Sequence, residues 1–118
     1  YVVTIGNSVY SAQSMIVQPM SLGNTISQGQ TQWAQKTISG YYTSIGSELY
    51  WGNPSNSLTM RIYTPDGYVL GPFYDNFDGL LNGDIPVKIT RSSGVAQGTY
   101  YYEIHGDRVS GSQYYTFS

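Results

Sequence analysis

The sequence predicts an all-β protein, an antiparallel β-sandwich of jelly-roll type with about eight strands. In several short segments apolar residues alternate with polar ones, which is the period of a strand with one buried face. Clusters of Gly, Pro, Asn, Asp and Ser separate these segments at regular spacing. Helical signals are nearly absent, because alanine occurs at only three positions and no apolar stripe of helical period extends past two turns.

The first half of the chain contains the shorter strand candidates. The segments expected to be extended are Tyr1–Ile5, Met15–Val17, Gln32–Ile38 and Ile45–Trp51. The only charged residue from Tyr1 to Ser47 is Lys36. Residues 1–23 are interpreted as a strand-bearing lead-in, which either belongs to the sandwich or forms a separate arm, and residues 24–118 as the sandwich domain.

The second half shows the clearest alternation. Leu58, Met60 and Ile62 alternate with polar neighbours, and Pro65-Asp66-Gly67 then supplies the residues of a tight turn. A strand is expected over 85–90, after Asn82-Gly83, the dipeptide most typical of two-residue hairpin connections. Pro86 has no N–H to donate, so this strand is expected at a sheet edge, or Pro86 at the start of the strand.

The last segments place a row of aromatic residues on strands. After Gly98, one phase of the alternation is expected in the core and the other at the surface. The core phase holds Tyr100, Tyr102 and Ile104, and the surface phase holds Thr99, Tyr101, Glu103 and His105. A short closing strand is expected over Tyr114–Phe117.

Composition excludes several classes of function. The net charge is −2 and only 10% of residues are charged, so the chain has no broad cationic surface for nucleic acid or an anionic membrane. Cysteine is absent, which excludes disulfides, thiolate catalysis and Cys-ligated metals. Polar residues interrupt every apolar stretch, so we expect no membrane insertion. A neutral, Tyr-rich chain that begins without Met is typical of a mature form or fragment of a longer extracellular or cell-surface protein.

Particular residues carry a resemblance to a known family. They are Trp51-Gly52-Asn53-Pro54, Ser57 to Tyr63, Pro65-Asp66-Gly67, and Gly98 to Ile104. These stretches resemble the bacterial and archaeal pre-peptidase C-terminal (PPC) domain, a family that includes the collagen-binding modules of clostridial collagenases. The resemblance implies a small jelly-roll accessory domain attached to a secreted or surface protein. Collagen-binding relatives hold calcium with acidic residues in the lead-in, whereas this chain has no acid before Glu48.

An acidic loop supplies candidate metal ligands. Asp75, Asp78 and Asp84 lie in a loop rich in Asn and Gly, and Ca²⁺ prefers carboxylate, amide and carbonyl oxygens. The spacing does not match an EF-hand. Calcium binding by these three residues is therefore one hypothesis, and a pair of Asx turns with solvated carboxylates is the other.

Aromatic side chains supply the second candidate site. Trp51, Tyr100 and Tyr102 are expected in the core. The aromatic residues expected at the surface, as a binding face for a polypeptide or a glycan, are Trp33, Tyr41, Tyr42, Tyr63 and Tyr101.

Enzymatic activity is not expected. A Ser-His-Asp triad would have to use the single histidine, His105, and no Gly-x-Ser-x-Gly elbow presents a serine. A pair of carboxylates could act in glycoside hydrolysis, but a small domain with acids on a Gly-rich loop lacks the walls of a cleft. The sequence therefore predicts a non-catalytic accessory or interaction domain that aids secretion, anchoring or substrate contact. The alternative is a structural domain of a cell-surface assembly, which packs against neighbouring domains and has no soluble ligand.

Overall fold

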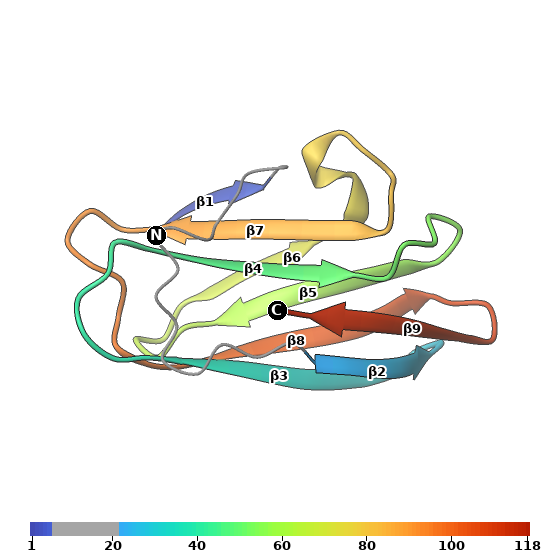
Figure 1. Cartoon of the computed structure of the whole chain (residues 1–118), viewed down its shortest axis with the longest axis horizontal. Helices are drawn as coiled ribbons and strands as arrows, with labels where there is room; N and C mark the ends of the chain where they lie inside the picture. Colours follow the sequence, from blue (N-terminus) through green and yellow to red (C-terminus); the bar gives the residue numbers. More distant parts are fainter. Residues whose placement is uncertain (6–21) are drawn as a thin grey trace.

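The computed structural model describes residues 1–5 and 22–118, apart from the side chains of residues 22, 23, 77 and 78. Within these ranges nine strands form two antiparallel sheets packed face to face, which confirms the predicted sandwich (Figure 1). One sheet has five strands in the order β1-β7-β4-β9-β2, and the other has four in the order β3-β8-β5-β6. The bounds are β1 Val2–Ile5, β2 Leu22–Ser27, β3 Thr31–Ile38, β4 Ser44–Tyr50, β5 Ser57–Tyr63, β6 Val69–Phe73, β7 Asp84–Thr90, β8 Gly98–Arg108 and β9 Ser112–Phe117, with a 3₁₀ helix η1 at Asp75–Asp78.

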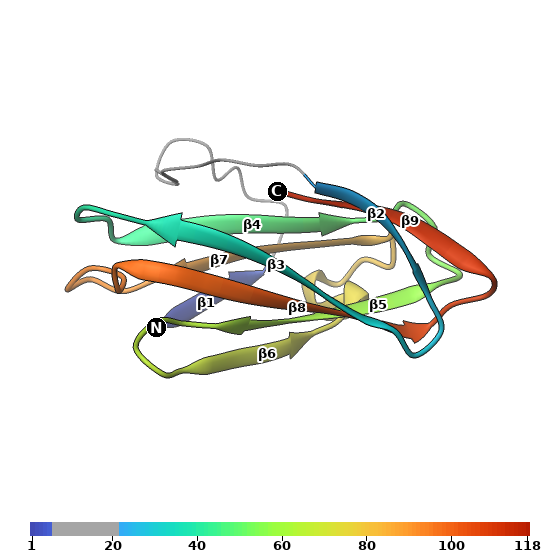
Figure 2. The same cartoon turned by 90° about the horizontal axis from the view of Figure 1, so that it is seen from below.

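The order of pairing is that of a jelly roll. Strand β5 pairs with β6, β4 with β7, β3 with β8, and β2 with β9, so eight strands are nested pairs along one long hairpin. The rolled hairpin is closed by two further pairings, β5 with β8 and β4 with β9. Figure 2 shows the two layers edge on, with β3 running obliquely across the view in front of β7. The predicted jelly-roll type is therefore confirmed.

The core lies between the sheets and comes from the inward phase of each strand. Leu58, Met60 and Ile62 are no more than 1% exposed, as their alternation predicts. The predicted burial of Tyr100 and Tyr102 is also confirmed. Trp51 is buried as well, and its indole Nε1 donates to the carbonyl oxygens of Asn53 and Asn56, so its polar atom is satisfied inside the core.

Two expectations about the strand over 85–90 need correction. Asn82-Gly83 does not close a hairpin, because β6 before it and β7 after it belong to different sheets and the loop crosses from one layer to the other. β7 is also not an edge strand, since it pairs with both β1 and β4. Pro86 is also not at the start of the strand, since it is the third of the seven residues of β7. β1 pairs only from Val87 onward, so the missing N–H of Pro86 interrupts no pairing with β1.

The lead-in over residues 1–23 is described only in part. β1 pairs with β7 at one edge of the five-stranded sheet, and β2 begins at Leu22 on the opposite edge. The strand expected at Met15–Val17 lies outside the described residues. In the described part of the chain, no helix has the length and apolar character needed to cross a membrane.

Candidate functional site

The outer face of the four-stranded sheet gathers polar and aromatic side chains into one row. Along β8 the outward phase is Tyr101, Glu103, His105 and Asp107, opposite in phase to the buried Tyr100, Tyr102 and Ile104. Because alternate residues of a strand lie about 7 Å apart, the row is about 20 Å long. This row is the axis of the site.

Two aromatic rings meet above β8. Trp33 on β3 is opposite Glu103, and Tyr63 on β5 is opposite Tyr101, so the two residues flank β8 diagonally. Their ring centroids are 5.5 Å apart with a 48° angle between the planes. Trp33 is 55% exposed and Tyr101 is 47% exposed, which leaves large aromatic faces open to solvent. We call Trp33, Tyr63 and Tyr101 the aromatic ridge.

The polar side chains beside the ridge form hydrogen bonds and an ion pair with one another. The Tyr63 hydroxyl donates to Glu103 Oε1 at 3.1 Å, and the Arg61 guanidinium approaches the same oxygen at 3.8 Å. The Thr31 hydroxyl and His105 Nδ1 form a hydrogen bond of 3.0 Å across β3 and β8. The Arg61–Glu103 pair is partly exposed, so it contributes little to stability but fixes the direction of both side chains.

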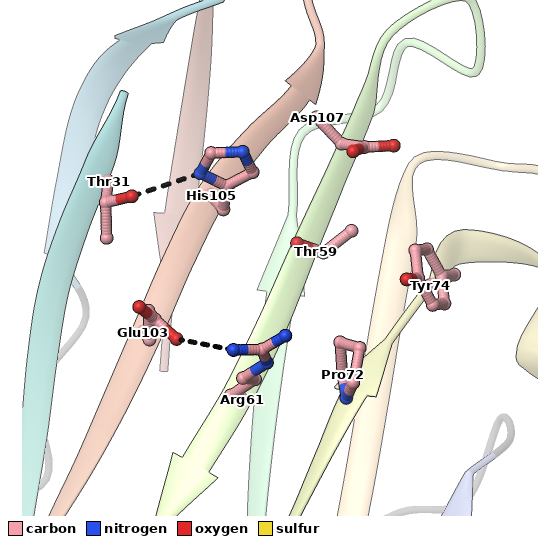
Figure 3. A pocket seen from close by; sticks show the side chains of 8 residues that line it. All are labelled: Thr31, Thr59, Arg61, Pro72, Tyr74, Glu103, His105 and Asp107. Atoms are coloured by element: carbon pink, nitrogen blue, oxygen red, sulfur yellow. Dashed lines mark hydrogen bonds and ion pairs between the residues drawn. The ribbon is translucent and has the colours of Figure 1, made fainter. Parts of the chain in front are cut away.

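Beyond the ridge the face is hollowed. A shallow cavity of about 330 Å³ is lined by Thr31, Thr59, Arg61, Pro72, Tyr74, Glu103, His105 and Asp107. Figure 3 shows that these side chains come from all four strands and from the segment after β6. A second hollow of about 410 Å³ shares Tyr74 and Asp107 with the first and extends toward Asn76 and Leu81. The first hollow adjoins the ridge at Glu103, which accepts the hydrogen bond from Tyr63, and both hollows are open to solvent. We call the ridge and the two hollows the groove.

The five aromatic residues expected at the surface do not lie together. Trp33, Tyr63 and Tyr101 form the ridge, as the alternation along their strands implies. Tyr41 and Tyr42 lie in the connection between β3 and β4. Tyr41 is exposed and its hydroxyl donates to the Ser92 carbonyl in the β7–β8 loop, whereas Tyr42 is half-buried and packs against the core.

The acidic loop uses Asp75 to organise its own backbone. Asp75 is 3% exposed, and its carboxylate accepts the backbone N–H groups of Asn82, Gly83 and Asp84 at 2.8 to 3.3 Å. The side chain of Asp78 lies outside the described residues. Among the side chains that are described, no three acids or histidines gather as metal ligands would. Calcium binding at this loop stays a prediction.

Sequence reasoning missed the polar half of the groove. It placed Glu103 and His105 at the surface of β8 but did not connect them with Arg61 or Thr31. Strand register brings these residues together, since Arg61 lies opposite Glu103 and Thr31 opposite His105. The pairing of β8 with both β3 and β5 is a long-range property, and no local signal in the sequence gives it.

No protein-family model matches the chain. An uncharacterised protein of Archaeoglobus fulgidus is 41% identical over 49 residues, which is 40% of this chain. The chain covers 65% of that relative's length.

Proposed function

We propose that this chain is a non-catalytic binding domain of a larger secreted or cell-surface protein, and that its groove holds a neutral polysaccharide. The observation that carries the proposal is the exposed aromatic ridge beside fixed polar side chains. A sugar ring presents a face of C–H groups that packs on an aromatic ring, and an edge of hydroxyls that pairs with planar polar groups. The groove offers both within one row.

Charge and shape favour an uncharged, extended ligand. The carboxylates of Glu103, Asp107 and Asp75 line the groove together with the guanidinium groups of Arg61 and Arg108, so no single sign of charge dominates it. The groove is open to solvent beside a row of side chains about 20 Å long, which suits a chain that continues beyond both ends, whereas small molecules are usually held in enclosed pockets. The resemblance to PPC domains supports the same role, an accessory domain that brings its host protein to a substrate or surface.

Matched tyrosine variants test the proposal. Tyr101 and Tyr114 are both exposed strand tyrosines, but Tyr114 lies on β9 in the other sheet. In affinity electrophoresis through gels of neutral polysaccharides, the polysaccharide that retards the protein should release Trp33→Ala and Tyr101→Ala, with at least a tenfold loss of affinity, or about 1.4 kcal/mol. Tyr114→Ala should bind as the unmodified chain does. Equal binding by all variants, or binding to denatured polypeptides alone, would refute the glycan groove.

A second candidate function has its own observation. The domain could be a structural unit of a cell-surface assembly, and the strand that favours this reading is β1, which contributes to the sandwich only at one sheet edge. Immunoblots of cell, envelope and medium fractions separate the two functions. A released fragment in the medium supports the accessory domain, and a product confined to the envelope supports the structural unit.

A further inference from the structure

Strand β1 is an addition to a jelly roll that is complete without it. The eight strands β2–β9 already form the nested pairs of the fold. β1 pairs with a single strand, β7, through the register Val2 to Thr90 and Ile5 to Val87. Without β1, this part of β7 would be an edge with unpaired N–H and C=O groups, which is a template for another strand.

The residue before β1 fits a socket with specific partners. The Tyr1 hydroxyl donates to Asp66 Oδ1 at 2.9 Å and accepts the Ala96 N–H at 3.1 Å. Its ring lies 4.3 Å from the Arg91 guanidinium and 5.6 Å from the Tyr68 ring. These partners come from the β5–β6 and β7–β8 connections, so Tyr1 fixes the register of β1 against parts of the chain far from it in sequence.

The faces of β1 also suit a strand that docks. Val3 and Ile5 pack against the core, and Val2 and Thr4 are exposed. An added strand is recognised at a sheet edge by three elements. Here they are an apolar face that covers core residues, main-chain pairing along β7 and one anchoring aromatic residue.

The connection to the rest of the chain permits docking on a neighbour. β1 and β2 lie on opposite edges of the same sheet, four strand spacings or about 19 Å apart. Residues 6–21 join them and can span on the order of 50 Å when extended. The length of the connection therefore exceeds what the crossing within one chain requires.

We propose that β1 exchanges between copies, so that residues 1–5 of one chain occupy the Tyr1 socket and the β7 edge of a second copy. Every contact of β1 is then preserved, so the balance between the exchanged and unexchanged forms depends on the concentration of chains. Reciprocal exchange between two copies closes a dimer, whereas exchange passed from each copy to the next generates open chains or rings. The proposal does not depend on the polysaccharide groove, which lies on the other sheet.

The absence of cysteine in the chain makes a direct test simple. Thr4 and Lys88 are register partners, and Thr4 points away from the core. A Thr4→Cys chain and an isotopically labelled Lys88→Cys chain are unfolded together, refolded at about 1 mM and oxidised. Mixed disulfides are then identified by mass spectrometry of the linked peptides. A disulfide between the two variants requires β1 of one chain to lie on β7 of another. The control replaces Lys88→Cys by Tyr114→Cys, an exposed position on β9.

We expect the Thr4→Cys and Lys88→Cys pair to give at least tenfold more mixed disulfide than the control pair, with the excess falling on dilution. Mixed disulfide no greater than in the control would overturn the proposal. The double variant Thr4→Cys/Lys88→Cys adds a second readout, because exchange produces covalent dimers or higher multimers at high concentration. A single intramolecular product at every concentration would show that β1 stays in its own chain and would also overturn it.

Discussion

Lys36 is the residue whose replacement gives the most quantitative test of this structure. It lies on β3 with its side chain between the sheets and is 4% exposed. Its ammonium donates to the Gly46 carbonyl at 2.7 Å and lies 5.3 Å from the Phe117 ring and 5.9 Å from the Tyr102 ring. A positive charge therefore sits in the core of the sandwich.

Burial removes water from this charge and lowers the pKa of Lys36 from its ordinary 10.5 to about 8. One pKa unit corresponds to about 1.4 kcal/mol, so below pH 8 the charge destabilises the native state by about 3 kcal/mol. Between pH 8 and 10.5 the unfolded chain binds the proton and the native chain releases it. Stability contributed by this group therefore rises with pH, by about 2 kcal/mol between pH 7 and pH 9.5.

Three buried tyrosines have the opposite effect on the free energy of unfolding, which they lower as the pH rises into the range where tyrosine ionises. Burial raises the pKa of Tyr100, Tyr102 and Tyr115, so the native state holds these protons when the unfolded chain begins to lose them near pH 10. Their contribution to stability is complete below that pH and falls above it. The window in which Lys36 dominates is thus pH 7 to 9.5.

Urea unfolding of the unmodified chain and Lys36→Met measures the effect, with the fluorescence of buried Trp51 as reporter. The free energy of unfolding of the unmodified chain, relative to that of Lys36→Met, should rise by about 2 kcal/mol from pH 7 to 9.5. Taking this difference cancels the tyrosine contribution. Lys88→Met, at the chain's other lysine, controls for the loss of one positive charge. Parallel pH profiles for the unmodified chain and Lys36→Met would refute the buried-charge argument.

Three further predictions concern the loop before β7. Asp75→Asn places an amide N–H₂ against backbone N–H donors and should lower the free energy of unfolding by about 2 to 3 kcal/mol, read from urea unfolding; an unchanged midpoint would contradict it. Gly83→Ala should destabilise the domain more than Gly29→Ala, because both glycines have positive φ but only at Gly83 does an added Cβ meet the Gly52 backbone nitrogen, at 2.6 Å. Equal melting temperatures for the two variants would rule out that close approach. If the acidic loop binds calcium, saturating Ca²⁺ at 100 times its dissociation constant should add about 2.7 kcal/mol, and coincident melting in Ca²⁺ and in EDTA would exclude it.

The sequence was most informative where structure is local. The alternation around Met60 predicts β5 and its buried phase, and Pro65-Asp66-Gly67 predicts the turn that follows. Asn82-Gly83 misled because the dipeptide favours a tight turn whatever the next strand pairs with, and here β7 pairs in the other sheet. The same alternation puts Lys36 in phase with buried Ala34 and Ile38, a signal of a buried lysine that was present in the sequence.

The candidate site was predictable only in part, for the same reason. Period-two alternation places Tyr101 at the surface, but the meeting of Trp33 with Tyr63 depends on both strands pairing with β8. For the acidic loop, the sequence predicts the kind of side chain but not the direction in which it points. Its composition suited a cation, whereas the direction in which Asp75 points was set by the crossing of the loop between sheets.

The nested pairing of the strands has a consequence for how the chain folds. Among the described strands, β5 and β6 alone are neighbours in sequence that also pair, whereas the outermost pair joins Leu22–Ser27 to Ser112–Phe117. Closing such distant segments is slow, and folding in milliseconds to seconds is typical of chains dominated by non-local contacts. During synthesis β9 emerges after the other described strands, so β2 and β4 remain without this partner until it has been made. The period in which these edges can meet a neighbouring chain is thus set by the topology itself.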